Sequence, residues 1–136
     1  VVLKDGDVGY EIQILSKQLS TIDNSNVEQF WIHQINREDH TSLYGFKEIK
    51  QRDLFRKIIS VNSIGPQIGM SLLDDFEVDQ LVKAIEKNDV KLLTKSQGIG
   101  KRIAERLVVE LKNKLQDYKN NKETTSNSPT KVKSNN

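Results

Sequence analysis

The stretch QGIGKRIAERLVVELK at residues 97–112 joins a short turn with two glycines to a strongly helical segment. Ile103, Leu107 and Leu111 recur at four-residue steps, the spacing of the buried face of an amphipathic helix. The two glycines permit a sharp backbone turn and the close approach of another molecule. This stretch therefore predicts a tight turn that is followed at once by a helix.

A second turn of the same kind lies upstream, where Ser63-Ile64-Gly65-Pro66 separates two helical patterns. Pro66 suits the first turn of a helix because its missing N–H has no partner there. Ile64 and Ile99 stand at the centres of the two turns, and we expect them to anchor the turns in the core. The free N–H groups and the positive dipole end of each following helix favour an anion such as a phosphodiester oxygen. Because main-chain amides would make the contact, binding should not depend on base sequence.

Positive side chains gather around the second of these turns. Lys101 and Arg102 stand at the start of the helix, where the helix dipole disfavours cations, and Arg106 follows about one turn later. Cations placed there at a cost in helix stability indicate an external anion. A single glycine turn between helices is usually a plain connector, but two such turns with these cations favour a binding role. The predicted binding residues are Ser63, Ile64, Gly65, Gln67, Gly98, Ile99, Gly100, Lys101, Arg102 and Arg106.

The charge is distributed unevenly along the chain, although the net charge is only +2. Residues 1–46 carry three lysines or arginines against seven acidic residues, whereas residues 91–114 carry seven against two. This polarity is typical of a surface that attracts polyanions. Ordinary solvated faces would give the same counts, and charge alone favours that simpler explanation.

The hydrophobic period divides the chain into a strand-rich front and a helical middle, which predicts the α+β class. Alternation predicts a strand over 8–14, and β-branched and aromatic residues predict others over 27–35 and 43–46, with a polar hairpin tip at 36–40. After residue 46 the spacing becomes helical. The predicted regions are a strand domain over 1–46, a helical domain over 47–118, and a disordered polar tail or linker over 119–136.

Aromatic residues of the front region have more than one possible role. Phe30 and Trp31 could stack on nucleic-acid bases, but such strand residues more often lie in the core, which we favour. Tyr44 and Phe46 are expected in the core or at a subunit interface.

The composition excludes several classes of chemistry. The chain has no cysteine, which excludes disulfides, thiolate-bound zinc and cysteine nucleophiles. His33 and His40 are too few for a typical histidine-built metal site, and the phosphate-loop motif of ATPases does not occur. The acidic residues within 74–79 do not converge on one helix face, so no magnesium site is predicted. We therefore predict no catalytic residue, no metal and no cofactor.

Membrane and export signals do not appear in the sequence. No apolar run approaches the roughly 18 residues needed to cross a bilayer, so no membrane partner is predicted. No signal-like start is visible either. The chain begins at Val1, inside a strand-like pattern and without Met, which leads us to expect that it is truncated at the front.

Four stretches together resemble the RuvA family, and the resemblance runs without large gaps from about residue 1 to 115. Two resemble strands of that family's N-terminal OB-fold barrel, and two resemble its paired helix-hairpin-helix motifs. They are 7–11 and 37–46 for the barrel, 54–66 for the first hairpin, and 98–112 for the second.

The resemblance implies a fold, a function and partners. The fold would be a partial OB-fold barrel followed by a tandem helix-hairpin-helix domain. Members of the family form homotetramers, one or two per junction, which hold a four-way (Holliday) DNA junction open and flat while the hairpins bind its arms across the minor groove. They are non-catalytic subunits that work with the RuvB ATPase motor and the RuvC resolvase in DNA recombination and repair in the bacterial cytoplasm. The first barrel strands and the domain that docks the motor are expected to be missing here.

The resemblance also assigns Glu38 and Asp39 to an acidic pin at the fourfold centre, where carboxylates would repel phosphates and help the strands separate. Residue types alone favour a plain solvated hairpin tip. Two positions depart from the family pattern, since Ser63 replaces a glycine of the first hairpin and Gln67 replaces a common lysine. We therefore expect the first hairpin to hold phosphate more weakly than the second.

Two alternatives from other functional classes remain open. A DNA glycosylase or nuclease could use the same hairpins for docking, although it would need a catalytic Asp or Lys at a cleft or converging carboxylates. A general helix-hairpin-helix module would bind linear and four-way DNA equally well.

Overall fold

The computed structural model describes residues 2–5, 8–22, 28–121 and 132–134, which belong to two compact units. The sheet unit comprises residues 1–52 together with 129–136, and the helical unit comprises residues 53–128. The boundary between Arg52 and Asp53 falls inside helix α2 (Ile49–Ile59). No helix in the described part of the chain combines the length and the apolar character that a membrane crossing requires.

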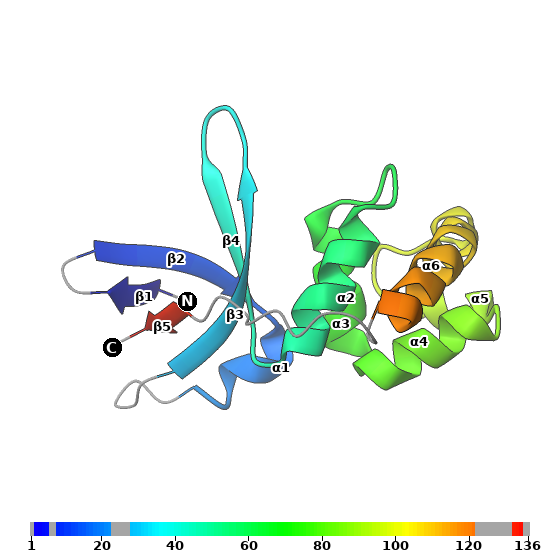
Figure 1. Cartoon of the computed structure of the whole chain (residues 1–136), viewed down its shortest axis with the longest axis horizontal. Coiled ribbons are helices and arrows are strands. Elements are labelled where there is room, and N and C mark those ends of the chain that lie inside the picture. The colour runs from blue at the N-terminus through cyan, green and yellow to red at the C-terminus, as the bar shows by residue number, and fades with distance from the viewer. Residues whose placement is uncertain (1, 6–7, 23–27, 122–131, 135–136) are drawn as a thin grey trace. The chain divides into compact units, whose positions relative to one another are not determined.

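The sheet unit holds a five-stranded curved sheet with the strand order β1-β2-β4-β3-β5 (Figure 1). Neighbouring strands are antiparallel except β2 and β4, which run parallel. The strands at the two ends of this order, β1 and β5, also contact each other, so the sheet curls toward closure. The elements of this unit are β1 (Val2–Asp5), β2 (Val8–Ile14), α1 (Ser16–Leu19), β3 (Glu28–Asn36), β4 (Thr41–Phe46) and β5 (Val132–Ser134).

The core of the sheet unit is formed by apolar side chains from the inner faces of the strands. Ile12 of β2 and Phe30 of β3 are buried together, and further isoleucine and leucine side chains pack against them. Tyr44 and Phe46 are buried as well, which confirms the core option for these residues. Trp31 is only half-buried, and the Arg52 guanidinium lies 5.3 Å from its ring centroid. This contact is a cation–π arrangement within the sheet unit.

The helical unit places α4 and α5 against the long helix α6 (Figure 1). Leu107, Leu111 and Leu115 of α6 are buried, and Ile103 is half-buried, so the face predicted from the four-residue spacing is the core face. Helix α3 starts at Pro66, as predicted, with the proline in the first helical turn. Besides α2, the elements of this unit are α3 (Pro66–Asp75), α4 (Val78–Glu86), α5 (Val90–Leu93) and α6 (Lys101–Asn121).

The C-terminal region differs from the expected disordered tail at two places. Helix α6 continues through Asn121, three residues into the predicted tail, where Lys119 favours helix and the two asparagines stand in the last turn. Residues Val132–Ser134 form β5 against the edge of β3, where main-chain pairing compensates for the scarcity of apolar side chains. The remainder of the predicted tail, 122–131 and 135–136, lies outside the described residues.

Candidate nucleic-acid interface

Two turns of the helical unit share one main-chain hydrogen-bonding pattern. We call residues 61–65 turn one and residues 96–100 turn two. In turn one the N–H of Ile64 donates to the carbonyl of Val61 at 3.1 Å, and in turn two the N–H of Ile99 donates to the carbonyl of Ser96 at 3.3 Å. The turns therefore match residue by residue, which confirms the alignment inferred from their sequences.

The third residue of each turn has a left-handed backbone. The φ angle is 72° at Ser63 and 83° at Gly98. Glycine adopts this conformation freely, whereas other L-residues lose roughly 1–2 kcal/mol in it. Turn one thus has the geometry of turn two in spite of a residue that disfavours it, which indicates that the surrounding helices impose the turn.

A helix begins directly after each turn. The carbonyl of Gly65 accepts a hydrogen bond from the N–H of Gly69 at 3.3 Å, and the carbonyl of Gly100 accepts one from the N–H of Ala104 at 3.0 Å. The first N–H groups of α3 and α6 have no acceptor within their own helix, and they lie at the positive end of the helix dipole. Each turn therefore presents donors and partial positive charge at the same point, as an anion site does.

The turns are anchored on one side and open on the other. Ile64 and Ile99 are 6% and 5% exposed, which confirms them as anchors and leaves only their main chains available to a ligand. Gly98 and Gly100 are exposed, and a Cβ built on either would meet no atom within 4 Å. Within the described ranges, no acceptor takes a hydrogen bond from the main-chain N–H of Gly98 or Gly100.

An open hollow of about 650 Å³ covers turn one. Ser63 is exposed there, and Gly65 is half-buried with free space where its Cβ would be. A phosphate group can approach the main chain of turn one through this open surface. Its lining residues are Ile59, Ser60, Val61, Asn62, Ser63, Ile64 and Gly65.

The cations of α6 divide between the two turns. Lys101 follows turn two directly, and its side chain is highly exposed. Its Nζ lies 4.0 Å from Oε1 of Glu105, which is a loose ion pair. Arg106, predicted to belong with turn two, instead reaches turn one, where its Nη1 donates to the carbonyl of Asn62 at 3.5 Å. Its Nε also lies 3.7 Å from Oε1 of Glu110. Arg106 is thus held beside the hollow over turn one by contacts on both sides.

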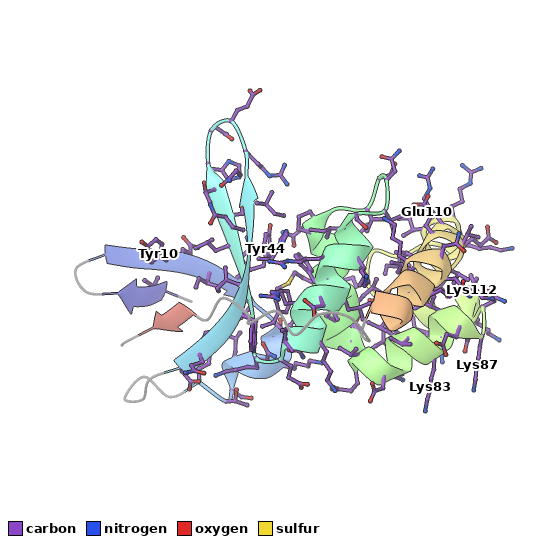
Figure 2. The ribbon with its side chains drawn as sticks, in the orientation of Figure 1. Tyr10, Tyr44, Lys83, Lys87, Glu110 and Lys112 are labelled. Atoms are coloured by element: carbon purple, nitrogen blue, oxygen red, sulfur yellow. The ribbon has the colours of Figure 1, made fainter. Side chains whose placement is uncertain are left out.

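Other cations of the helical unit point elsewhere. Lys83 and Lys87 extend from the same side of α4, away from Glu110, which lies on the other side of the unit (Figure 2). Because Glu110 contacts Arg106, which reaches Asn62, the side of Glu110 is the side of turn one. Lys83 and Lys87 therefore point away from turn one.

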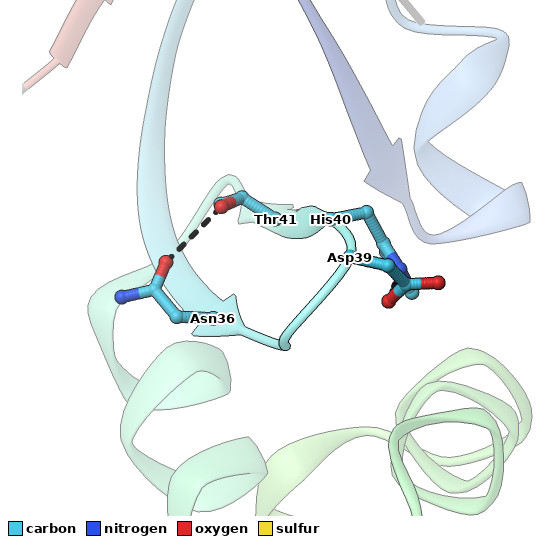
Figure 3. A network of polar contacts seen from close by, with 4 residues as sticks. All are labelled: Asn36, Asp39, His40 and Thr41. Carbon is cyan, nitrogen blue, oxygen red and sulfur yellow. Dashed lines mark hydrogen bonds and ion pairs between the residues drawn. The ribbon is translucent and has the colours of Figure 1, made fainter.

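The sheet unit carries the second candidate feature, the hairpin tip between β3 and β4. The N–H of Arg37 donates to the carbonyl of His40 at 2.8 Å and closes the tip, as predicted. The side-chain oxygen of Asn36 accepts from the Thr41 hydroxyl at 3.2 Å and braces the ends of the two strands (Figure 3). Glu38 and Asp39 are exposed at the tip, so two carboxylates project into solvent next to each other.

One carboxylate of the tip contacts the imidazole of the next residue. Oδ1 of Asp39 lies 2.7 Å from Nδ1 of His40 (Figure 3). The Asp39 side chain is nevertheless 84% exposed. The tip can therefore present an acidic group to an approaching phosphate, whereas its charge has no role in packing.

Comparison with known proteins gives two family models that match in succession. The model of the RuvA N terminal domain matches residues 1–45, and that of the SAM-like helix-hairpin-helix tandem matches residues 55–113. The chain is 61% identical over 135 residues to a protein of Prochlorococcus marinus strain NATL2A named Holliday junction branch migration complex subunit RuvA, and 65% identical over 124 residues to that of strain NATL1A. The RuvA protein of Synechococcus sp. strain CC9311 is 46% identical over 115 residues.

The chain belongs to the RuvA family. These three alignments cover 99%, 91% and 85% of the chain but only 60%, 55% and 52% of the respective relatives. The chain thus spans somewhat more than half the length of the RuvA proteins that it matches. Within the RuvA pattern, the acidic tip lies in the N-terminal domain match, and both turns lie in the helix-hairpin-helix match.

Sequence reasoning missed one cation of this candidate interface. Nζ of Lys114 donates to the Ser60 hydroxyl at 2.5 Å, next to turn one. The available signal was weak, because Lys114 lies eight residues after Arg106, about two turns further along α6 but roughly 80° around it. The carbonyl contact of Arg106 with Asn62 had no sequence signal, since any residue type supplies a carbonyl.

Proposed function

We propose that this chain binds four-way DNA junctions through the main-chain amides of turns one and two, independently of base sequence. The observation that supports this most is the repetition of one open amide turn twice in a single unit. A lone turn would hold one anion weakly, whereas two turns in one unit can engage two phosphates of the same duplex at once.

The neighbouring cations would supply most of the affinity. Lys101 and Arg102 serve turn two, and Arg106 with Lys114 serves turn one. Each cation that neutralises a phosphate releases condensed counterions, so binding should weaken steeply with salt. The cations at turn one also compensate in part for Gln67, which stands where the family commonly has a lysine.

The acidic tip would give the preference for junctions over linear duplex. Glu38 and Asp39 repel phosphates at short range, so they tolerate the open centre of a four-way junction better than a continuous backbone. In this proposal the tip acts by exclusion and contributes no binding energy of its own.

The complex in which the chain would act extends beyond its own residues. Its relatives are named subunits of a branch migration complex. We propose that the chain is a non-catalytic subunit, that it assembles as a homotetramer or octamer on the junction, and that ATP hydrolysis comes from a RuvB-type motor. The RuvC resolvase as a further partner, and the bacterial cytoplasm as the location, belong to the same proposal.

The test compares fluorescently labelled four-way junction and linear duplex of the same sequences by anisotropy across a salt series. We expect tighter binding to the junction. The substitutions Lys101→Glu and Arg102→Glu together should weaken binding to all sequences alike, by about 100-fold, because two charge-assisted hydrogen bonds of roughly 1.5 kcal/mol or more each are lost.

The matched control is Lys83→Glu with Lys87→Glu, which changes the net charge equally on the opposite side of the unit. It should retain nearly wild-type affinity. Equal losses in both double variants would mean that overall charge, and not turn two, determines binding. Equal affinity for junction and linear duplex would support a general docking module, and cleavage of either DNA in the presence of Mg²⁺ would support a nuclease.

A further inference from the structure

A small polar network connects helix α3 to turn two. The hydroxyl of Ser96, which is 3% exposed, donates to Oδ2 of Asp75 at 2.6 Å. The same hydroxyl lies 3.1 Å from Oγ of Ser71, and Ser71 in turn lies 3.0 Å from the carbonyl of Gln97. Ser71 and Asp75 are one helical turn apart on α3, so both face the same point of turn two.

The count of protons gives the direction of these hydrogen bonds. Each serine hydroxyl has one proton to donate. Ser96 gives its proton to the Asp75 carboxylate at the shortest distance of the network, so the Ser71 proton is the one shared between Ser96 Oγ and the Gln97 carbonyl. The carboxylate thus sets the orientation of both hydroxyls, and removing either Ser96 or Asp75 would release the other two groups.

The network acts on the peptide groups that shape the amide site. The carbonyl of Ser96 closes turn two by accepting from the N–H of Ile99, and the carbonyl of Gln97, directly before Gly98, is held by Ser71. These two peptide groups precede the left-handed residue Gly98 and therefore decide where the next amides point. In turn one the corresponding residue, Val61, is buried and apolar, so its side chain cannot make hydrogen bonds of this kind.

Helix α3 begins directly after turn one, so the network fixes turn two to the same rigid element that carries turn one. We propose that Ser71, Asp75 and Ser96 are positioning residues for DNA binding, which hold the two amide sites in register so that both engage one duplex at the same time. This inference rests on the proposed function. Without the network, turn two would have to be ordered at the moment of binding, at an entropic cost to affinity.

The experiment compares wild type with Ser96→Ala, Ser71→Ala and Asp75→Asn in the full chain. The two readouts are affinity for a labelled four-way junction, measured well below the unfolding temperature, and amide hydrogen exchange of residues 98–101 without DNA. We expect Ser96→Ala to bind about tenfold more weakly and to exchange faster at these amides, with Ser71→Ala showing a smaller change of the same kind. The salt slope of binding should stay at the wild-type value, because the phosphate contacts themselves remain.

Ile85→Val is the control for stability, because Ile85 is buried in α4 and makes no part of the network. It should lower the unfolding temperature without changing affinity or local exchange. Wild-type affinity in Ser96→Ala would overturn the inference, as would an equal loss of affinity in Ile85→Val. If wild type itself fails to bind the junction, the proposed function is wrong, while unchanged exchange at 98–101 in Ser96→Ala would separately refute the positioning role.

Discussion

Replacement of Gly100 by alanine tests whether the open glycine of turn two serves folding or binding. A Cβ at this position would meet no atom within 4 Å, and the residue does not have a left-handed φ. Alanine is less favourable than glycine at the position just before a helix, which lowers the free energy of unfolding. It also lowers the entropy of the unfolded chain, which raises the free energy of unfolding by a similar amount. We therefore expect the free energy of unfolding to change by less than about 1 kcal/mol.

Binding should respond much more strongly than folding. The added methyl group would occupy the surface through which a phosphate must approach the amides at the start of α6. A hydrogen bond to a charged group contributes about 1.5–3 kcal/mol, so the loss of one such bond lowers affinity by roughly 10- to 100-fold. The measurement is anisotropy with labelled junction DNA, alongside thermal unfolding of the same preparation.

Gly69→Ala is the matched control, because the same change is made at a glycine that packs in the core. Its Cβ would lie 3.0 Å from two ring carbons of Phe55, so the substitution should destabilise the fold by about 1–3 kcal/mol through overpacking. The folded fraction of this variant should bind DNA as wild type does. Wild-type affinity in Gly100→Ala, or a large loss of its stability, would refute the assignment of Gly100 to the interface.

Two further substitutions examine turn one. Ser63→Gly removes the cost of a left-handed backbone, which exceeds the entropic penalty of glycine. We therefore expect chemical denaturation to show a gain of about 0.5–1 kcal/mol in unfolding free energy, together with tighter DNA binding. A loss of stability would show that the Ser63 side chain has a role of its own. Arg106→Gln keeps a donor for the Asn62 carbonyl but removes the charge. The magnitude of the slope of log affinity against log salt should therefore decrease by about 0.9. An unchanged slope would exclude Arg106 from phosphate contact.

The local features of the turns and their helices were predictable from sequence, because each feature depends on residues that are close together in the chain. The isoleucine anchors, the proline at the start of α3 and the buried face of α6 all follow from spacing and residue type. The strand tip at 36–40 was predictable for the same reason, since a polar run between two apolar strands has few other conformations.

Long-range features were not predictable from one sequence. The reach of Arg106 from α6 to the carbonyl of Asn62 joins residues 44 positions apart, and no residue type marks it. The pairing of β5 with β3 depends on main-chain groups of a polar segment that has no strand pattern. Helix α1 is four residues long, which is too short for a helical period to appear.

The two turns reach one geometry by different means, and this difference explains where the cations lie. Turn two has glycine at its left-handed position, a lysine at the start of its helix, and the Asp75 network that fixes its peptide groups. Turn one has a strained serine and lacks a cation in its own first helical turn, but Arg106 and Lys114 of α6 reach it from the side. Helix α6 therefore begins at turn two and supplies cations to turn one, while α3 begins at turn one and holds turn two. Because each helix serves both turns, a change in the position of α3 relative to α6 should weaken the two amide sites together and not one at a time.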